Sequence, residues 1–131
     1  MINPPDFELY NYLYQFCESN YDTYDYLPLE SENAAYPFVE FGDTQLTGGA
    51  TKYALNGDIS LTINVWCNAN DRYTINKMIN DIYHEAINIE ETNNYRVSFD
   101  IQRSDTQVLT DTSVENTILL HGILDLHFKI L

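Results

Sequence analysis

The chain has three histidines, and they are the first residues to consider for metal or acid–base chemistry. His84-Glu85 begins like the helix of a zinc protease, but Asn88 stands where the second zinc ligand would be. His121 and His127 share one face of a predicted strand, yet at ~3.4 Å per residue they lie about 20 Å apart, too far to bind one metal ion. We therefore interpret the histidines as surface residues.

Nucleophile and phosphate-binding patterns are missing as well. Neither Cys17 nor Cys67 has a Cys-x-x-Cys partner or a neighbouring histidine that would activate its thiol. We expect both to be reduced and to lie in or near the core, since two cysteines are too few for a disulfide scaffold. Gly48-Gly49 lacks the spacing and the following Lys-Ser/Thr of a phosphate-binding loop. The residues predict no catalytic, cofactor-binding or metal site, so the protein is not expected to be an enzyme.

Charge and composition limit the classes of partner. The 131 residues suit a single domain, and a hydrophobic fraction of 44% is enough for one core. Twenty acidic against six basic side chains give a net charge of −14, which excludes binding to nucleic acid through phosphate neutralisation and attraction to an anionic membrane. The acidity either serves solubility or forms a functional surface. Without a visible signal peptide or an apolar run of membrane-spanning length, a soluble protein made in a reducing cytoplasm is expected.

Two helices are predicted. Asn3 can cap the first, with proline in its first turn, and Leu9, Leu13 and Phe16 follow helical spacing. The second spans residues 70–89, and its apolar stripe should pack on a sheet. The stripe consists of Ile75, Met78, Ile79, Ile82, Ala86 and Ile89.

The predicted strands show alternation of apolar and polar residues. Their ranges are 36–41, 58–67, 95–102 and 117–131. In the last strand, Ile118 belongs to the apolar side. The intervening ranges 18–35 and 104–116 are read as loops, the second as a loop or protruding arm, and 42–56 as a mobile loop or an extended hairpin arm. The order helix, β, β, helix, β, β predicts an α+β fold, in which an antiparallel or mixed sheet carries the N-terminal and central helices.

Five residues are candidates for contacts with other proteins. Trp66 falls on the polar face of its strand, where its ring either covers the sheet edge, lies under a loop, or anchors a partner. Tyr10 and Tyr14 widen the apolar surface of the first helix, which then needs cover from the domain or from a neighbouring subunit. Asp105 and Asp111 lie in the polar segment between the last two strands.

Residues 36–45 (YPFVEFGDTQ) resemble a strand of the tail terminator, or tail completion, proteins of phages with long non-contractile tails, especially phages of Gram-positive hosts. Further blocks resemble the same family in order and spacing, and the resemblance covers residues 28–131. They are residues 51–52, Gly57, 59–66 (ISLTINVW), the helix from Asn70 to Ile82, 109–111 and 119–126. The tyrosine-rich first helix and the strong acidity depart from the family pattern.

The resemblance implies a tail-terminator-like domain over residues 1–131 that forms a hexameric ring at the head-proximal end of the tail tube. Such a ring ends tube polymerisation and joins the tail to the head. Its partners would be copies of itself, the major tail tube protein and a neck or head-completion protein, and DNA would pass through its lumen without specific binding. The protein would reside in the virion, and in the host cytoplasm during assembly. No cofactor and no membrane are implied. Two alternatives remain: another head–tail joining component, or an acidic DNA-mimic inhibitor.

Overall fold

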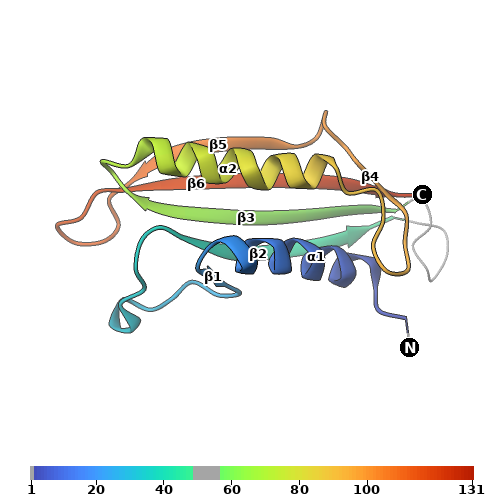
Figure 1. The fold of residues 1–131 in the computed structure, drawn as a ribbon, viewed down its shortest axis with the longest axis horizontal. Helices are drawn as coiled ribbons and strands as arrows, with labels where there is room; N and C mark the ends of the chain where they lie inside the picture. Colours follow the sequence, from blue (N-terminus) through green and yellow to red (C-terminus); the bar gives the residue numbers. More distant parts are fainter. Residues whose placement is uncertain (1, 49–56) are drawn as a thin grey trace.

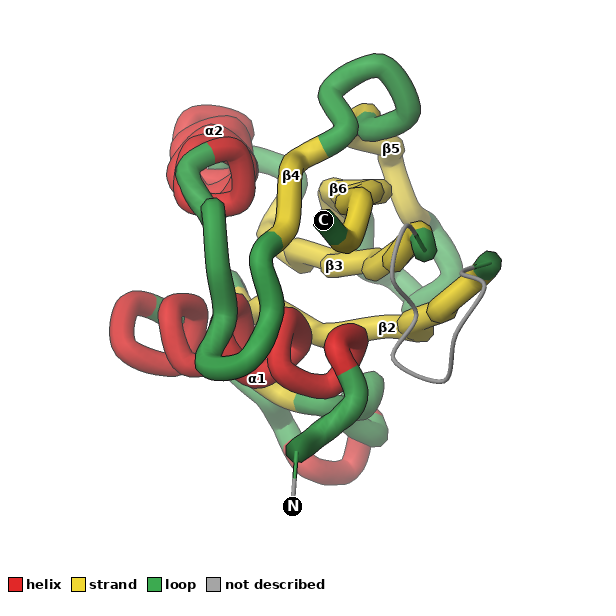
Figure 2. The backbone as a smooth tube through the Cα atoms, turned by 90° about the vertical axis from the view of Figure 1, so that its right-hand side faces the viewer, coloured by secondary structure: helices red, strands yellow, loops and turns green. Residues whose placement is uncertain are grey.

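Two helices pack on one face of a six-stranded sheet (Figures 1 and 2). The structure, a computed structural model, describes residues 2–48 and 57–131. The elements are α1 (Pro5–Asn20), β1 (Thr23–Tyr24), the short 3-10 helix η1 (Glu30–Glu32), β2 (Phe38–Thr47), β3 (Asp58–Asn68), α2 (Arg72–Ile87), β4 (Val97–Phe99), β5 (Asp105–Asp111) and β6 (Leu119–Ile130).

The sheet is mixed, with the order β1-β2-β3-β6-β4, and β5 also pairs with β6. Among the described strands, only the β1–β2 pair is parallel. At the centre, β3 and β6 pair from Asp58↔Lys129 to Asn68↔Leu119. Strands β4 and β5 lie one after the other along the same edge of β6. The predicted α+β class, with an N-terminal and a central helix on a sheet, is confirmed.

The core fills the space between the sheet and both helices. In β3, the predicted alternation is confirmed, since every second residue from Ile59 to Cys67 is buried. The stripe of α2 is buried as predicted, although the helix runs from Arg72 to Ile87 instead of from 70 to 89. Both cysteines are buried and unbonded, as expected.

Helix α2 approaches β6 most closely at Gly122. A Cβ atom at this glycine would lie 2.5 Å from Cδ1 of Ile79 and 3.3 Å from Cδ1 of Ile75. Because β6 has no side chain here, the two branched side chains of α2 can settle directly on the strand backbone.

Helix α1 buries Leu9, Leu13 and Cys17 against the sheet. Asn3 does not cap it: Pro4 occupies the N-cap position and no side chain accepts a capping hydrogen bond there. Pro5 lies in the first turn, where its missing N–H costs nothing.

Two predicted loops contain strands. Residues 42–47 belong to β2, so the mobile-loop reading is wrong there and the hairpin alternative fits; residues 49–56 lie outside the described residues. A register shift between Phe41 and Thr44 accommodates Gly42 in the strand. Residues 105–111, predicted as a loop or arm, form β5. Its side chains are polar on both faces except Val108 and Leu109, so its sequence shows no clear alternation.

The strand predicted for 95–102 shortens to Val97–Phe99 because a turn follows it. The backbone N–H of Asp100 donates to the carbonyl of His127, and the hydroxyl of Ser104 donates to the carbonyl of Asp100. The last strand begins at Leu119, so Ile118 precedes it and is 57% exposed instead of joining the core. The range 18–35 is mainly a connection, but α1 extends into it and β1 and η1 lie within it.

Candidate functional site

The face of the sheet opposite α1 and α2, here called the helix-free face, carries a small network centred on Trp66. Register places Trp66 of β3 between Phe38 of β2 and His121 of β6. The indole ring stacks on the imidazole of His121, with ring centroids 3.9 Å apart and planes 10° apart. The indole Nε1 donates a hydrogen bond of 3.2 Å to Oε1 of Glu40. Two neighbouring strands therefore hold the only tryptophan of the chain in one orientation.

His121 is half-buried, so its interpretation as a plain surface residue is wrong. Its Nε2 lies 2.7 Å from Oδ1 of Asn64, and an amide oxygen can only accept, so Nε2 carries a proton. Burial lowers the pKa of His121, although the carboxylate of Asp111 acts in the opposite direction. The ring is therefore a neutral imidazole at pH 7. His127 is also half-buried, with Nε2 3.1 Å from Oδ1 of Asp125, whereas His84 is exposed.

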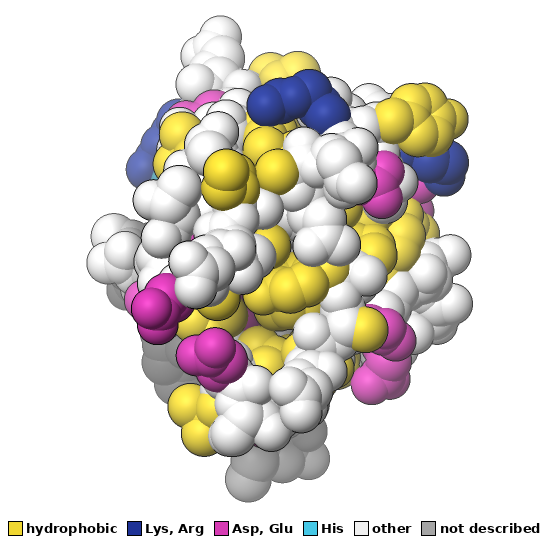
Figure 3. Space-filling view, turned by 90° about the vertical axis from the view of Figure 1, so that its left-hand side faces the viewer, with side chains coloured by type: hydrophobic (Ala, Val, Ile, Leu, Met, Phe, Trp, Pro, Cys, Tyr) yellow, Lys and Arg dark blue, Asp and Glu magenta, His cyan; other side chains and the backbone are white. Residues whose placement is uncertain are grey.

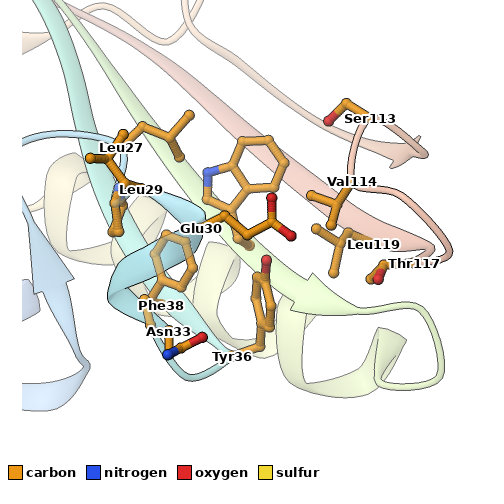
Figure 4. Close-up of a pocket in the computed structure, with 13 residues that line it drawn as sticks. Leu27, Leu29, Glu30, Asn33, Tyr36, Phe38, Ser113, Val114, Thr117 and Leu119 are labelled. Atoms are coloured by element: carbon orange, nitrogen blue, oxygen red, sulfur yellow. The ribbon is translucent and has the colours of Figure 1, made fainter.

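A cavity of about 280 Å³ opens beside Trp66 at one end of the sheet. Its walls come from the segment before β2, from the segment before β6, and from the strand residues between them. Figure 4 shows Leu27 and Leu29 on one side, Val114 and Leu119 on the other, and the carboxylate of Glu30 between them. Tyr36 and Phe38 stack on each other at 5.3 Å within the same lining. The cavity is therefore an apolar, aromatic hollow.

The charge around this hollow is negative. Among the described residues that line it, Glu30 is the only charged one, and none is a lysine or arginine. Figure 3 shows hydrophobic side chains gathered in the centre of this end of the molecule, with acidic side chains on both flanks and lysine or arginine side chains near the upper margin. The arrangement is suited to binding an apolar group.

The part of the chain that the structure describes shows neither a metal site nor a membrane-spanning helix. No group of three or more His, Cys, Asp and Glu residues there could hold a metal ion. None of the described helices is long and apolar enough to cross a membrane.

The structure separates the five predicted contact residues. Trp66 lines the cavity, and Asp111 lies close enough to influence His121. Tyr10 and Tyr14 lie on α1, stack on each other at 5.8 Å and pack against Phe41. They are half-buried within this chain, and burial, with a smaller contribution from Asp25, raises the pKa of Tyr10 to about 12.

Asp105 and Asp111 are the two ends of β5, which lies along β6. Sequence reasoning missed Glu40, His121 and the apolar rim of the cavity. The signal for the rim was Leu27-Pro28-Leu29, two leucines in an otherwise polar connection.

The class defined by these observations is an α+β protein with a mixed sheet, two helices on one face and an apolar hollow at one end. No protein-family model matches the chain, and no curated protein matches it. Among solved structures, the fold is similar to a chain in the virion of a native gene transfer agent (GTA) particle, with a TM-score of 0.55 and 14% sequence identity. The similarity covers 82% of this chain and 77% of that chain. At this identity it establishes a shared fold.

Proposed function

We propose that the protein is a structural component of a tailed-phage or phage-like virion, and specifically the tail terminator. The observation that carries the proposal is the fold shared with a virion chain over most of both lengths. The ordered blocks of residues 28–131 that resemble tail terminators support the narrower role. The site agrees with it, since a hollow suited to protein contacts, without catalytic groups, is what an assembly protein needs.

The two edges of the sheet supply the surfaces for ring formation. On one side, β5 exposes an edge that no other described strand covers, and its five central residues are uncharged. On the opposite side, β1 covers only Val39 and Glu40 of β2, which leaves residues 44–47 with β3 as their single described partner. Exposed strand edges are templates for pairing with another chain. Two different edges on opposite sides fit a head-to-tail contact, which closes into a ring when the rotation permits.

In such a hexamer the helix-free face would line the lumen. This face carries Glu40 and Asp125, whose carboxylates would repel the phosphates of passing DNA, whereas Asp58 on the same face is paired with Arg103 and Lys129. The partners would be neighbouring copies, the major tail tube protein and a neck or head-completion protein. The protein would reside at the tail–neck junction of the virion after assembly in the host cytoplasm.

The test uses tubes polymerised from the tail tube protein of the same particle. Addition of this protein should shorten the tubes and place a ring at one end in electron micrographs. Leu109 of β5 is 46% exposed and Ile101 is 62% exposed but off the strand. Leu109→Lys should abolish rings and capping, because lysine protects an edge from pairing, whereas Ile101→Lys should not.

Other results would contradict the proposal in distinct ways. Unchanged tubes together with binding to head proteins would indicate another neck component. Tight binding to a DNA-binding protein that is reversed by added DNA would indicate a DNA mimic.

A further inference from the structure

We propose that the cavity beside Trp66 is a docking site for a segment of another protein that inserts one large apolar side chain and carries a lysine or arginine next to it. The site lies at the end of the sheet, and its lining includes Val114 and Leu119, which adjoin the last residue of β5. The inference rests on the lining of the cavity and does not require ring formation.

The size and lining of the cavity indicate an inserted side chain. At about 280 Å³ the cavity is at the lower end of the ~300–1,000 Å³ range of ligand pockets, a size that one large side chain can fill. At its rim, Leu27 is 55% and Leu29 is 67% exposed, so both leucines remain largely in water until something covers them. Such exposed leucines around a concave aromatic surface are typical of a protein contact.

Trp66 is pre-organised to receive this side chain. Its Nε1 is already satisfied by Glu40 and one face of its ring is covered by His121. The ring is therefore held beside the cavity, and binding needs no further ordering of this side chain.

Charge complementarity identifies the partner as basic. The carboxylate of Glu30 points into the cavity (Figure 4) and accepts no hydrogen bond from any described residue. No basic residue is among the described lining residues, and the net charge of −14 on the chain favours the approach of a cation. A second copy of this chain would bring the same negative charge, which disfavours self-docking at this position.

Because Trp66 is the only tryptophan, its fluorescence reports occupancy of the cavity directly. The probe is a ten-residue synthetic peptide with a central Leu-Arg-Leu and no aromatic residue. Titration should give a saturable blue shift of the emission. Replacement of the arginine by glutamate, or of both leucines by serine, should weaken binding at least tenfold.

Variants of the protein locate the contacts. Glu30→Gln should weaken binding several-fold and reduce its salt dependence, and Leu29→Ser should weaken it at least tenfold. Both residues are exposed, so neither change should disturb folding. Glu90→Gln removes another exposed carboxylate, one that does not line the cavity, and should leave binding unchanged.

Three results would overturn the inference. One is the absence of a saturable change at millimolar peptide. Another is equal binding of the glutamate-containing peptide. The third is a shift that depends on protein concentration alone, which would show that a second copy fills the cavity. Failure here would leave the tube-capping result and the Leu109→Lys comparison unaffected, so the two proposals fail separately.

Discussion

Glu8 is a buried carboxylate within a helix, and its partners come from the segment between α2 and β4. It accepts hydrogen bonds from the hydroxyl of Thr92 at 2.8 Å and from the backbone N–H of Asn94 at 2.9 Å, and another from the amide of Asn94. Burial by itself raises its pKa, but these hydrogen bonds outweigh burial and the net pKa is lowered. Glu8 thus ties α1 to a distant part of the chain.

We predict that Glu8→Gln lowers the free energy of unfolding by about 1–3 kcal/mol at pH 7. Since the folded pKa lies below the unfolded one, the carboxylate stabilises the fold above the ordinary pKa of glutamate, and this contribution is lost as pH falls through the folded pKa. The difference between variant and parent should therefore shrink near pH 3. Urea unfolding at both pH values measures it, with the exposed Glu18→Gln as control. An equal loss at both pH values would contradict the role of the charge.

At the same scale, His121 should act as a pH-dependent quencher of Trp66. Its folded pKa is lowered from 6.5, mainly by burial, so the neutral ring stabilises the fold and this stabilisation is lost as pH falls below about 6.5. Trp66 emission should decrease with a midpoint below 6.5, because an imidazolium stacked on an indole quenches it. The transition should disappear in His121→Gln. Persistence of the same transition in that variant would assign it to another group.

At the scale of elements, the contact between α2 and β6 forms much of the core. Ile79 is buried and lies over Gly122, where the strand has no side chain. Ile79→Asp should destabilise the fold by several kcal/mol, since it buries an unpaired charge in an apolar contact. Thermal unfolding tests this, with the exposed neighbour Asn80→Asp as control. A variant that melts within a degree of the parent would disprove the importance of this contact.

Strand β5 should have two kinds of backbone amide. Those that face β6 are hydrogen-bonded, whereas those that face away have no described strand to bind and should exchange rapidly with solvent in a monomer. Ring formation should protect the amides that face away from β6 against exchange. Hydrogen exchange at low and high oligomer content measures this difference. Unchanged exchange of these amides in a confirmed ring would exclude β5 as the subunit contact.

At the scale of the whole molecule, charge opposes assembly. Six copies at −14 each carry −84 formal charges, and their repulsion weakens ring closure at low ionic strength. The screening length falls from about 30 Å at 0.01 M salt to about 10 Å at 0.1 M. We therefore expect mainly monomers in dilute low-salt buffer and a shift toward rings with added salt or protein. Mass photometry across a salt series tests this, and rings that are most stable at the lowest salt would show that attraction dominates.

The sequence was sufficient to predict a helix or strand wherever the burial of its side chains follows a regular period. Strand β3 and the stripe of α2 could be predicted because each has one buried face, so residue types repeat with the geometry of the element. The edge strand β5 and the second half of β2 could not, because their side chains are mostly exposed on both faces and only backbone pairing defines them.

The sequence by itself determined the α+β class, the two helices, the central strands, the buried cysteines and the acidity. Only the tertiary structure decided the candidate site. Glu40, Trp66 and His121 come from three strands, and residues near 28 and 114 meet around one cavity. The physical reason is that local periodicity depends on neighbours along the chain, whereas strand order and register bring together residues whose spacing in the sequence carries no pattern.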